Sequence, residues 1–159
     1  MTVIENFHPG LKNLGFKKHG NHFQREYSEG VQFVSFMRLV SFDEYYVQLG
    51  VKYNSIHLNF KTNGAHSCPI QAELRDLARL YKVPLNETGF SSQVSKDQSE
   101  ECSPLVALME KWFERWSNPI DVTTWIKDFY AMKTATLLWP QAKEVFGLPL
   151  KNPIQKIEP

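Results

Sequence analysis

The stretch that decides the fold is residues 21–53, NHFQREYSEGVQFVSFMRLVSFDEYYVQLGVKY. Apolar and polar side chains alternate along it, which is the period of a half-buried β-strand. Turn-forming residues at 28–30 and 41–43 divide the stretch into three parts. The predicted strands are residues 21–28, 31–40 and 44–53. Because short turns join them, they predict an antiparallel meander.

The meander is expected to continue to about residue 76. Residues 56–60 keep the alternation, and Asn63-Gly64 is typical of a tight hairpin turn. Residues 67–75 alternate again, which favours a strand up to about Asp76. A helix from Ile70 to Tyr81 also fits the apolar spacing. We therefore expect a sheet of four or five strands within residues 21–76.

Helices are expected on both sides of this sheet region. Before it, Ile4, Phe7, Leu11 and Leu14 share one helical face. Pro9 should kink this helix or mark its start, and Gly15 suits the position after its end, with Phe16 folding back onto Leu11. After it, Ser103 and Asp121 are the predicted N-caps of two further helices. The predicted helices are residues 4–14, 104–117, 121–133 and 140–146.

This order of elements predicts an α+β fold with the helices packed on one face of the sheet. We expect a single domain over residues 1–148, followed by an extended tail over residues 149–159, which carry three prolines. Residues 84–102 are polar and serine-rich, and they predict a surface loop.

Composition limits the class of partner. Eighteen basic residues face 17 acidic ones, so the formal charge of +1 offers no long-range field to attract a nucleic acid or an anionic membrane. The N-terminus has no basic and apolar segments of a signal peptide, and no apolar run approaches the ~18 residues of a membrane span. Cys68 and Cys102 lie far apart and outside any ligand-spaced motif, which favours a reducing interior. A cytoplasmic location is predicted.

Four segments carry a resemblance to a known family. They are residues 14–25 (LGFKKHGNHFQR), residues 46–51 (YVQLGV), residues 68–74 from Cys68 to Leu74, and residues 112–115 (WFER). Together they resemble the bacterial family catalogued as domain of unknown function 4304, over most of residues 4–147. Met37 departs from it, because a polar Gln is expected there. The resemblance implies a strand over residues 67–75 and a bacterial origin, and it carries over no catalytic residue.

No motif predicts catalysis, a metal or a cofactor. His57, His66 and Cys68 flank the predicted hairpin, but their spacing matches no zinc motif, so Cys68 is read as a small buried hydrophobe. Cys68 or Cys102 with a histidine could form a nucleophilic dyad, but an ordinary structural or loop cysteine is the preferred reading. Lys17, Lys18 and His19 are read as a solvated helix end.

The outward face of the sheet is the candidate site. On the assumed alternation it combines an apolar centre, Val34 and Phe36, with a polar rim. The rim residues are His22, Gln24, Glu26, Arg38, Tyr46, Gln48, Gln71, Glu73 and Arg75. The candidate partner-binding residues are Phe36, Arg38, Tyr46, Gln48 and Arg75, because aromatic and Arg side chains are enriched at interface hot spots.

These features favour a non-enzymatic module that binds another protein, similar in role to an immunity or adaptor protein. The alternative is a small-molecule-binding domain or an enzyme whose site lies between the sheet and the 84–102 loop. Neither a nucleic acid nor a membrane is expected as partner, and the sequence does not decide the oligomeric state.

Overall fold

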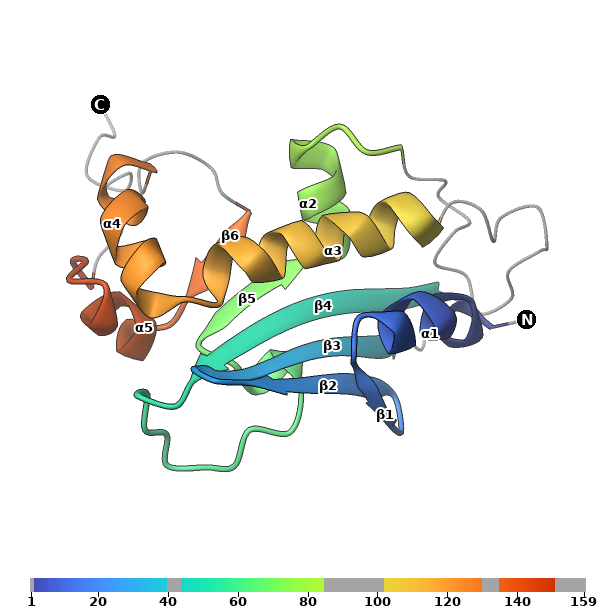
Figure 1. The fold of residues 1–159 in the computed structure, drawn as a ribbon, viewed down its shortest axis with the longest axis horizontal. Coiled ribbons are helices and arrows are strands. Elements are labelled where there is room, and N and C mark those ends of the chain that lie inside the picture. Colours follow the sequence, from blue (N-terminus) through green and yellow to red (C-terminus); the bar gives the residue numbers. More distant parts are fainter. Residues whose placement is uncertain (1, 40–43, 85–101, 130–134, 151–159) are drawn as a thin grey trace.

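The computed structural model describes residues 2–39, 44–84, 102–129 and 135–150. Over these residues the fold is α+β, as predicted, with six antiparallel strands in the order β1-β2-β3-β4-β5-β6 (Figure 1). The strands are β1 (Lys17–His19), β2 (His22–Tyr27), β3 (Gly30–Leu39), β4 (Glu44–Tyr53), β5 (Ile70–Glu73) and β6 (Thr136–Leu138). The helices are α1 (Val3–Asn13), η1 (Ala65–Ser67, 3-10), α2 (Leu74–Leu80), α3 (Cys102–Trp116), α4 (Pro119–Phe129) and α5 (Pro140–Val145).

Helix α1 begins at a capping box and runs through Pro9. The Thr2 hydroxyl accepts from the Glu5 amide, and the Glu5 carboxylate accepts from the Thr2 amide. The helix therefore does not start near Pro9, which lies inside it as its seventh residue. At its end the Phe16 amide donates to the Leu11 carbonyl at 3.0 Å, which confirms the predicted fold-back.

Strands β1 and β2 form a two-residue hairpin that the sequence reasoning missed. Residues 17–19 are a strand and not a helix end, and His19 pairs with His22 across the turn. Gly20 has a φ of +62° at the first turn position, where glycine avoids the steric cost of a side chain. Residues 21–53 then form β2, β3 and β4 close to their predicted bounds.

Residues 54–69 do not continue the meander. The strand expected at 56–60 and the hairpin expected at Asn63-Gly64 are both wrong, because this segment is irregular apart from η1. It lies on the sheet face opposite α1, α2 and α3 (Figure 1). A Cβ added to Gly50 would lie 2.7 Å from Cys68 Sγ, so glycine is what allows this close approach. We call residues 54–69 the covering segment.

The ambiguous stretch from residue 67 onward contains both predicted structures. Residues 70–73 form strand β5, and the chain then turns directly into helix α2. Strand β6, which the sequence reasoning missed, pairs with the outer side of β5.

The helix boundaries also differ from the predicted caps. Helix α3 begins at Cys102, so Ser103 lies inside it. The Asn118 side chain accepts hydrogen bonds from the amides of Ile120 and Asp121, so Asn118, not Asp121, caps α4.

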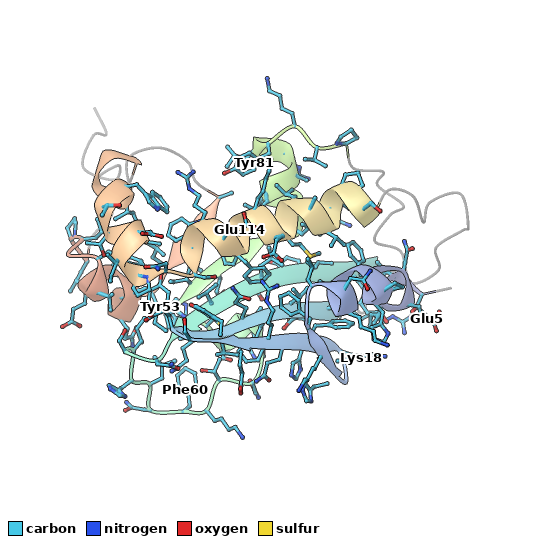
Figure 2. All side chains as sticks on the ribbon, viewed as in Figure 1. Glu5, Lys18, Tyr53, Phe60, Tyr81 and Glu114 are labelled. Atoms are coloured by element: carbon cyan, nitrogen blue, oxygen red, sulfur yellow. The ribbon has the colours of Figure 1, made fainter. Side chains whose placement is uncertain are left out.

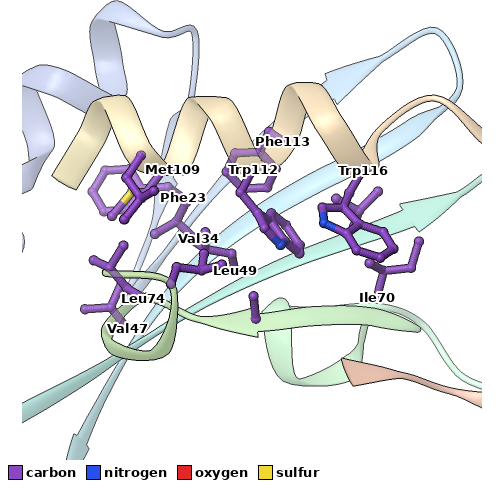
Figure 3. Packing of buried hydrophobic residues seen from close by; sticks show 14 of the residues in the cluster. Phe23, Val34, Val47, Leu49, Ile70, Leu74, Met109, Trp112, Phe113 and Trp116 are labelled. Carbon is purple, nitrogen blue, oxygen red and sulfur yellow. The ribbon is translucent and has the colours of Figure 1, made fainter. Parts of the chain in front are cut away.

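The main core lies between the sheet and the helices. Helix α3 directs Met109, Trp112, Phe113 and Trp116 toward the strands. Figure 3 shows these side chains above Phe23, Val34, Leu49 and Ile70 of the sheet. All of these residues are buried, and aromatic rings supply much of the contact area.

Polar side chains of the sheet also fix the position of α3. The Arg25 guanidinium makes a two-pronged ion pair with Glu110, at 3.0 and 3.1 Å. The Tyr53 hydroxyl donates to the Trp116 carbonyl at 2.6 Å, at the last turn of the helix (Figure 2). Tyr27 donates in the same way to the Ser117 carbonyl. The end of α3, where carbonyls lack helical partners, is thereby held by the sheet.

None of the helices in the described part of the chain is long and apolar enough to cross a membrane.

Candidate functional site

The pairing register decides which side chains share a face of the sheet. Residues directly opposite in an antiparallel pair point to the same side. Phe36 pairs with Val47, and Val34 pairs with both Phe23 and Leu49. All of them point toward the helices, and Phe36 is only 1% exposed. The predicted apolar centre of Val34 and Phe36 on the outward face is therefore wrong, because both belong to the main core.

Two more of the predicted site residues, Arg38 and Arg75, do not lie on the outward face. Arg38 pairs with Tyr45 and so belongs to the helix-covered side, near the exposed end of β3. Arg75 is not in a strand, because it lies in helix α2. Tyr46 and Gln48 do lie on the outward face, so the structure brings together two of the five predicted residues.

The pairing register shows which residues lie on the outward face, and they differ from the predicted set. One row across it runs His19, His22, Ser35, Gln48 and Glu73, from β1 to β5. Met37 and Tyr46 form the next pair along β3 and β4. Ser35 is buried beneath the covering segment, while the other six residues are partly or fully exposed. We call His19, His22, Met37, Tyr46, Gln48 and Glu73 the open strip.

The covering segment lies on part of the outward face and so forms one edge of the open strip. It buries Phe33 against Ala65 and Cys68, in a second small apolar cluster. Gln71 donates to the carbonyls of His66 and Cys68, at 3.0 and 2.7 Å, and so fastens the segment to the sheet. Gln71 Oε1 in turn accepts from Gln48 Nε2 at 2.6 Å. The amide of Gln48 is thus held in place at the margin of the covered area.

Histidines gather at the β1 end of the strip. The rings of His19 and His22 stack with centroids 5.8 Å apart, and His22 also packs on Phe33. His66 approaches from η1. Its ring lies over Gly64 next to Ser35, because a Cβ on Gly64 would be 3.1 Å from His66 Cε1 and 3.2 Å from Ser35 Oγ. Burial lowers the pKa of His22, and the neighbouring imidazoles of His19 and His66 lower it further. We call His19, His22 and His66 the histidine cluster.

The opposite end of the strip is acidic. Burial raises the pKa of Glu73, and the negative charge of Asp76 raises it further. Burial and the carboxylates of Glu73 and Asp76 raise the pKa of Tyr46 as well. Met37, with 45% of its surface exposed, lies between the two ends of the strip. The strip therefore combines an apolar and aromatic middle with polar ends of different chemistry.

Stability should depend on pH through His22. Because its pKa is lowered in the folded state, the unfolded chain binds more protons just below pH 6.5. The free energy of unfolding should therefore rise as the pH rises to about 6.5 and stay level above it. Replacing His22 with Gln should remove this part of the slope. Urea denaturation of both proteins between pH 5 and 8 measures it, and equal slopes would contradict the assignment.

The remaining chemistry of the described residues is limited. Cys68 is fully buried, as expected for a small hydrophobe, and burial raises the pKa of its thiol, which disfavours the nucleophilic thiolate. Within the described ranges, no group of three or more His, Cys, Asp or Glu side chains could hold a metal ion. The side chain of Cys102 and residues 85–101 lie outside the described residues. The alternative site between the sheet and the 84–102 loop stays a prediction.

Comparisons with known proteins identify a family. The sequence profile of the family described as "Domain of unknown function (DUF4304)" matches residues 7–127, which is most of the chain. That range includes five of the six strands, α2, α3, most of α1 and α4, and all of the open strip. Neither the search of curated proteins nor that of solved structures found a match.

Proposed function

Since the chain belongs to the DUF4304 family, whose function is unknown, we propose its function from its own surface: it is a protein-binding module that docks a partner on the open strip. The residues of this docking site differ from those predicted from the sequence. Phe36, Arg38 and Arg75 are no longer part of it, and His19, His22, Met37 and Glu73 join Tyr46 and Gln48.

The observation that carries the proposal is the pair of Met37 and Tyr46. They lie opposite each other on β3 and β4, the two longest strands, and 45% of the surface of Met37 is exposed. Methionine adapts to irregular surfaces, and tyrosine combines contact area with a hydroxyl, so both are enriched at interfaces. Apolar contact in the middle with polar groups around it is the usual layout of a protein interface.

The scaffold behind the strip supports docking without rearrangement. The strip lies on paired strands, and the opposite face of these strands packs against α1 and α3 through a continuous core. Preformed interfaces on such elements generally move little on binding, which limits the entropic cost of association.

The cellular role that fits this surface is that of an immunity-like or adaptor-like protein in a bacterial cytoplasm. The formal charge of +1 supports a protein partner over a nucleic acid, because it provides no general attraction to phosphates. The free, buried thiol of Cys68 is compatible with a reducing compartment.

Affinity capture from cells of the source organism tests the proposal. We expect the wild-type chain to retain a specific protein, and the Met37→Glu, Tyr46→Ala variant to lose it by at least tenfold. The reason is that a carboxylate in the middle of an interface must be desolvated without a partner, which costs several kcal/mol. Quantitative mass spectrometry of the eluates gives the ratio.

Arg38→Glu is the matched control. It introduces the same carboxylate one residue along β3 but on the other side of the sheet. Capture by this control should equal that of the wild type, with thermal melting used to verify that both variants are folded. Equal capture by the strip variant and the wild type, or the same loss in the control, would rule out the open strip as the docking site.

A further inference from the structure

The histidine cluster has a geometry that the docking proposal leaves unused. Three imidazoles from separate elements lie near one another, without the close approach that a shared metal ion would need: His19 from β1, His22 from β2 and His66 from η1. His19 and His22 are held by the hairpin, and the exposed ring of His66 lies beside Gly64, close to Ser35. Imidazole N–H groups gathered on ordered backbone can donate hydrogen bonds to one anion that is larger than a metal ion.

The charges around the cluster favour an anion. Lys17 lies on the same face as His19 and is exposed, and Gln24 lies between it and the covered Phe33. Figure 2 labels the neighbouring Lys18 on the same hairpin, although its register places it on the other face. Of the acidic groups on this face, Glu26 lies two residues beyond Gln24 along β2, and Glu73 lies three strands from His22, at roughly 14 Å by the usual strand spacing.

We propose that the histidine cluster and Lys17 form a binding site for an oxyanion, and that in the docked complex this anion is an acidic side chain of the protein partner. This assignment rests on the proposed function, since it names the chemistry of the partner at one end of the open strip. A carboxylate placed among the three rings accepts hydrogen bonds from their ring N–H groups, and Lys17 adds a positive charge.

Anion binding at this site is coupled to proton uptake. In the free protein burial holds the pKa of His22 below its usual range, and the imidazoles of His19 and His66 lower it further. An anion reverses this balance, because a nearby negative charge favours the protonated imidazole. Affinity should therefore increase as the pH falls. The expected gain is on the order of tenfold per pH unit for each proton taken up.

Imidazole NMR of the full chain measures this directly. Inorganic phosphate and a hexaglutamate peptide are titrated separately at pH 6.0 and 7.5. We expect both probes to shift the ring resonances of His19, His22 and His66, to raise the pKa of His22, and to bind several-fold more tightly at pH 6.0. A short single-stranded oligonucleotide is the third arm, and tighter binding of this oligonucleotide than of the peptide would overturn the assignment to a protein carboxylate.

The chain provides its own control residue. His57 is exposed on the covering segment and belongs to no part of the cluster, so His57→Gln should leave phosphate binding unchanged. His22→Gln and His19→Gln should each weaken it at least fivefold. Shifts equal at His57 and at the cluster would mean a nonspecific ionic effect and would overturn the site. The site would also be overturned if stoichiometric zinc shifted the ring resonances of the histidine cluster while phosphate had no effect on them.

Different experimental results would contradict the docking strip and the anion site. If phosphate and peptide leave the cluster unchanged while partner capture still depends on Met37 and Tyr46, the anion site is wrong and the docking strip stands. If Met37→Glu, Tyr46→Ala leaves capture intact while the cluster still binds phosphate, the docking strip is wrong, the link to a partner carboxylate fails with it, and a free-anion site remains.

Discussion

Replacing Phe36 with Ala is expected to lower the free energy of unfolding by about 3–5 kcal/mol. Phe36 is 1% exposed, and its ring packs against those of Phe7 and Phe23, with centroids 5.6 and 5.7 Å away. The truncation leaves a cavity where β2, β3 and α1 meet. Because a domain is stable by only ~5–15 kcal/mol, this is a large share of the total. Urea denaturation with a fixed slope measures it.

Met37→Ala is the control for this prediction. Met37 is the next residue along β3 and points to the other side of the sheet, where 45% of its surface is exposed. Its replacement should change the free energy of unfolding by less than about 1 kcal/mol. Comparable losses for the two variants would contradict the register that separates core from open strip.

Replacing Arg25 with Met is expected to cost roughly 2–4 kcal/mol. Besides the ion pair with Glu110, Arg25 donates to the Leu14 carbonyl at 2.7 Å and to Gln32 Oε1 at 2.6 Å, and its guanidinium lies 4.4 Å from the centre of the Phe16 ring. Methionine keeps part of the packing but leaves these acceptors without their donor. Since the two charged side chains are 19% and 25% exposed, the cost should fall at the lower end of that for buried pairs.

A second substitution separates the lost pair from the isolated charge. In the Arg25→Met, Glu110→Leu double variant no carboxylate is left without its partner, so stability should recover by at least about 1 kcal/mol relative to Arg25→Met. Chemical denaturation of the wild type, both single variants and the double variant gives the coupling energy. A double variant no more stable than Arg25→Met would show that the loss comes from packing and from the Leu14 and Gln32 contacts.

The sequence was enough to locate the strands, but not to decide which face of each strand meets the helices. Turn-forming residues at 28–30 and 41–43 marked the bounds of β2, β3 and β4, and apolar alternation is clear in β2 and β4. Strand β3, however, carries large apolar residues on both sides: Val34 and Phe36 toward the helices, Phe33 toward the covering segment. With both faces apolar, the pattern does not show which one meets the helices. Tyr46 and Gln48 were assigned to the right face, whereas Phe36 and Arg38 were not.

The elements that were missed depend on contacts distant in sequence or on irregular backbone. Strand β6 has three residues and exists by pairing with β5, with α2, α3 and α4 in between. Asn63 and Gly64, a pair typical of a hairpin turn, lie instead in the irregular covering segment that packs on the sheet. The histidine cluster joins residues 19, 22 and 66. Only the cross-turn pair His19 and His22 could have been found, from a hairpin reading of Gly20-Asn21.

The strand order has a kinetic consequence. Strands β1 to β5 follow one another in both sequence and space, so their pairing closes comparatively short loops, which favours fast assembly. Strand β6 can join only after the long intervening segment with α3 and α4 has docked, which makes it a late step. Until then the outer edge of β5, with Ile70 and Ala72 in it, remains open to pairing with another chain. Slow docking of α3 would thus lengthen the time during which the nascent protein can aggregate.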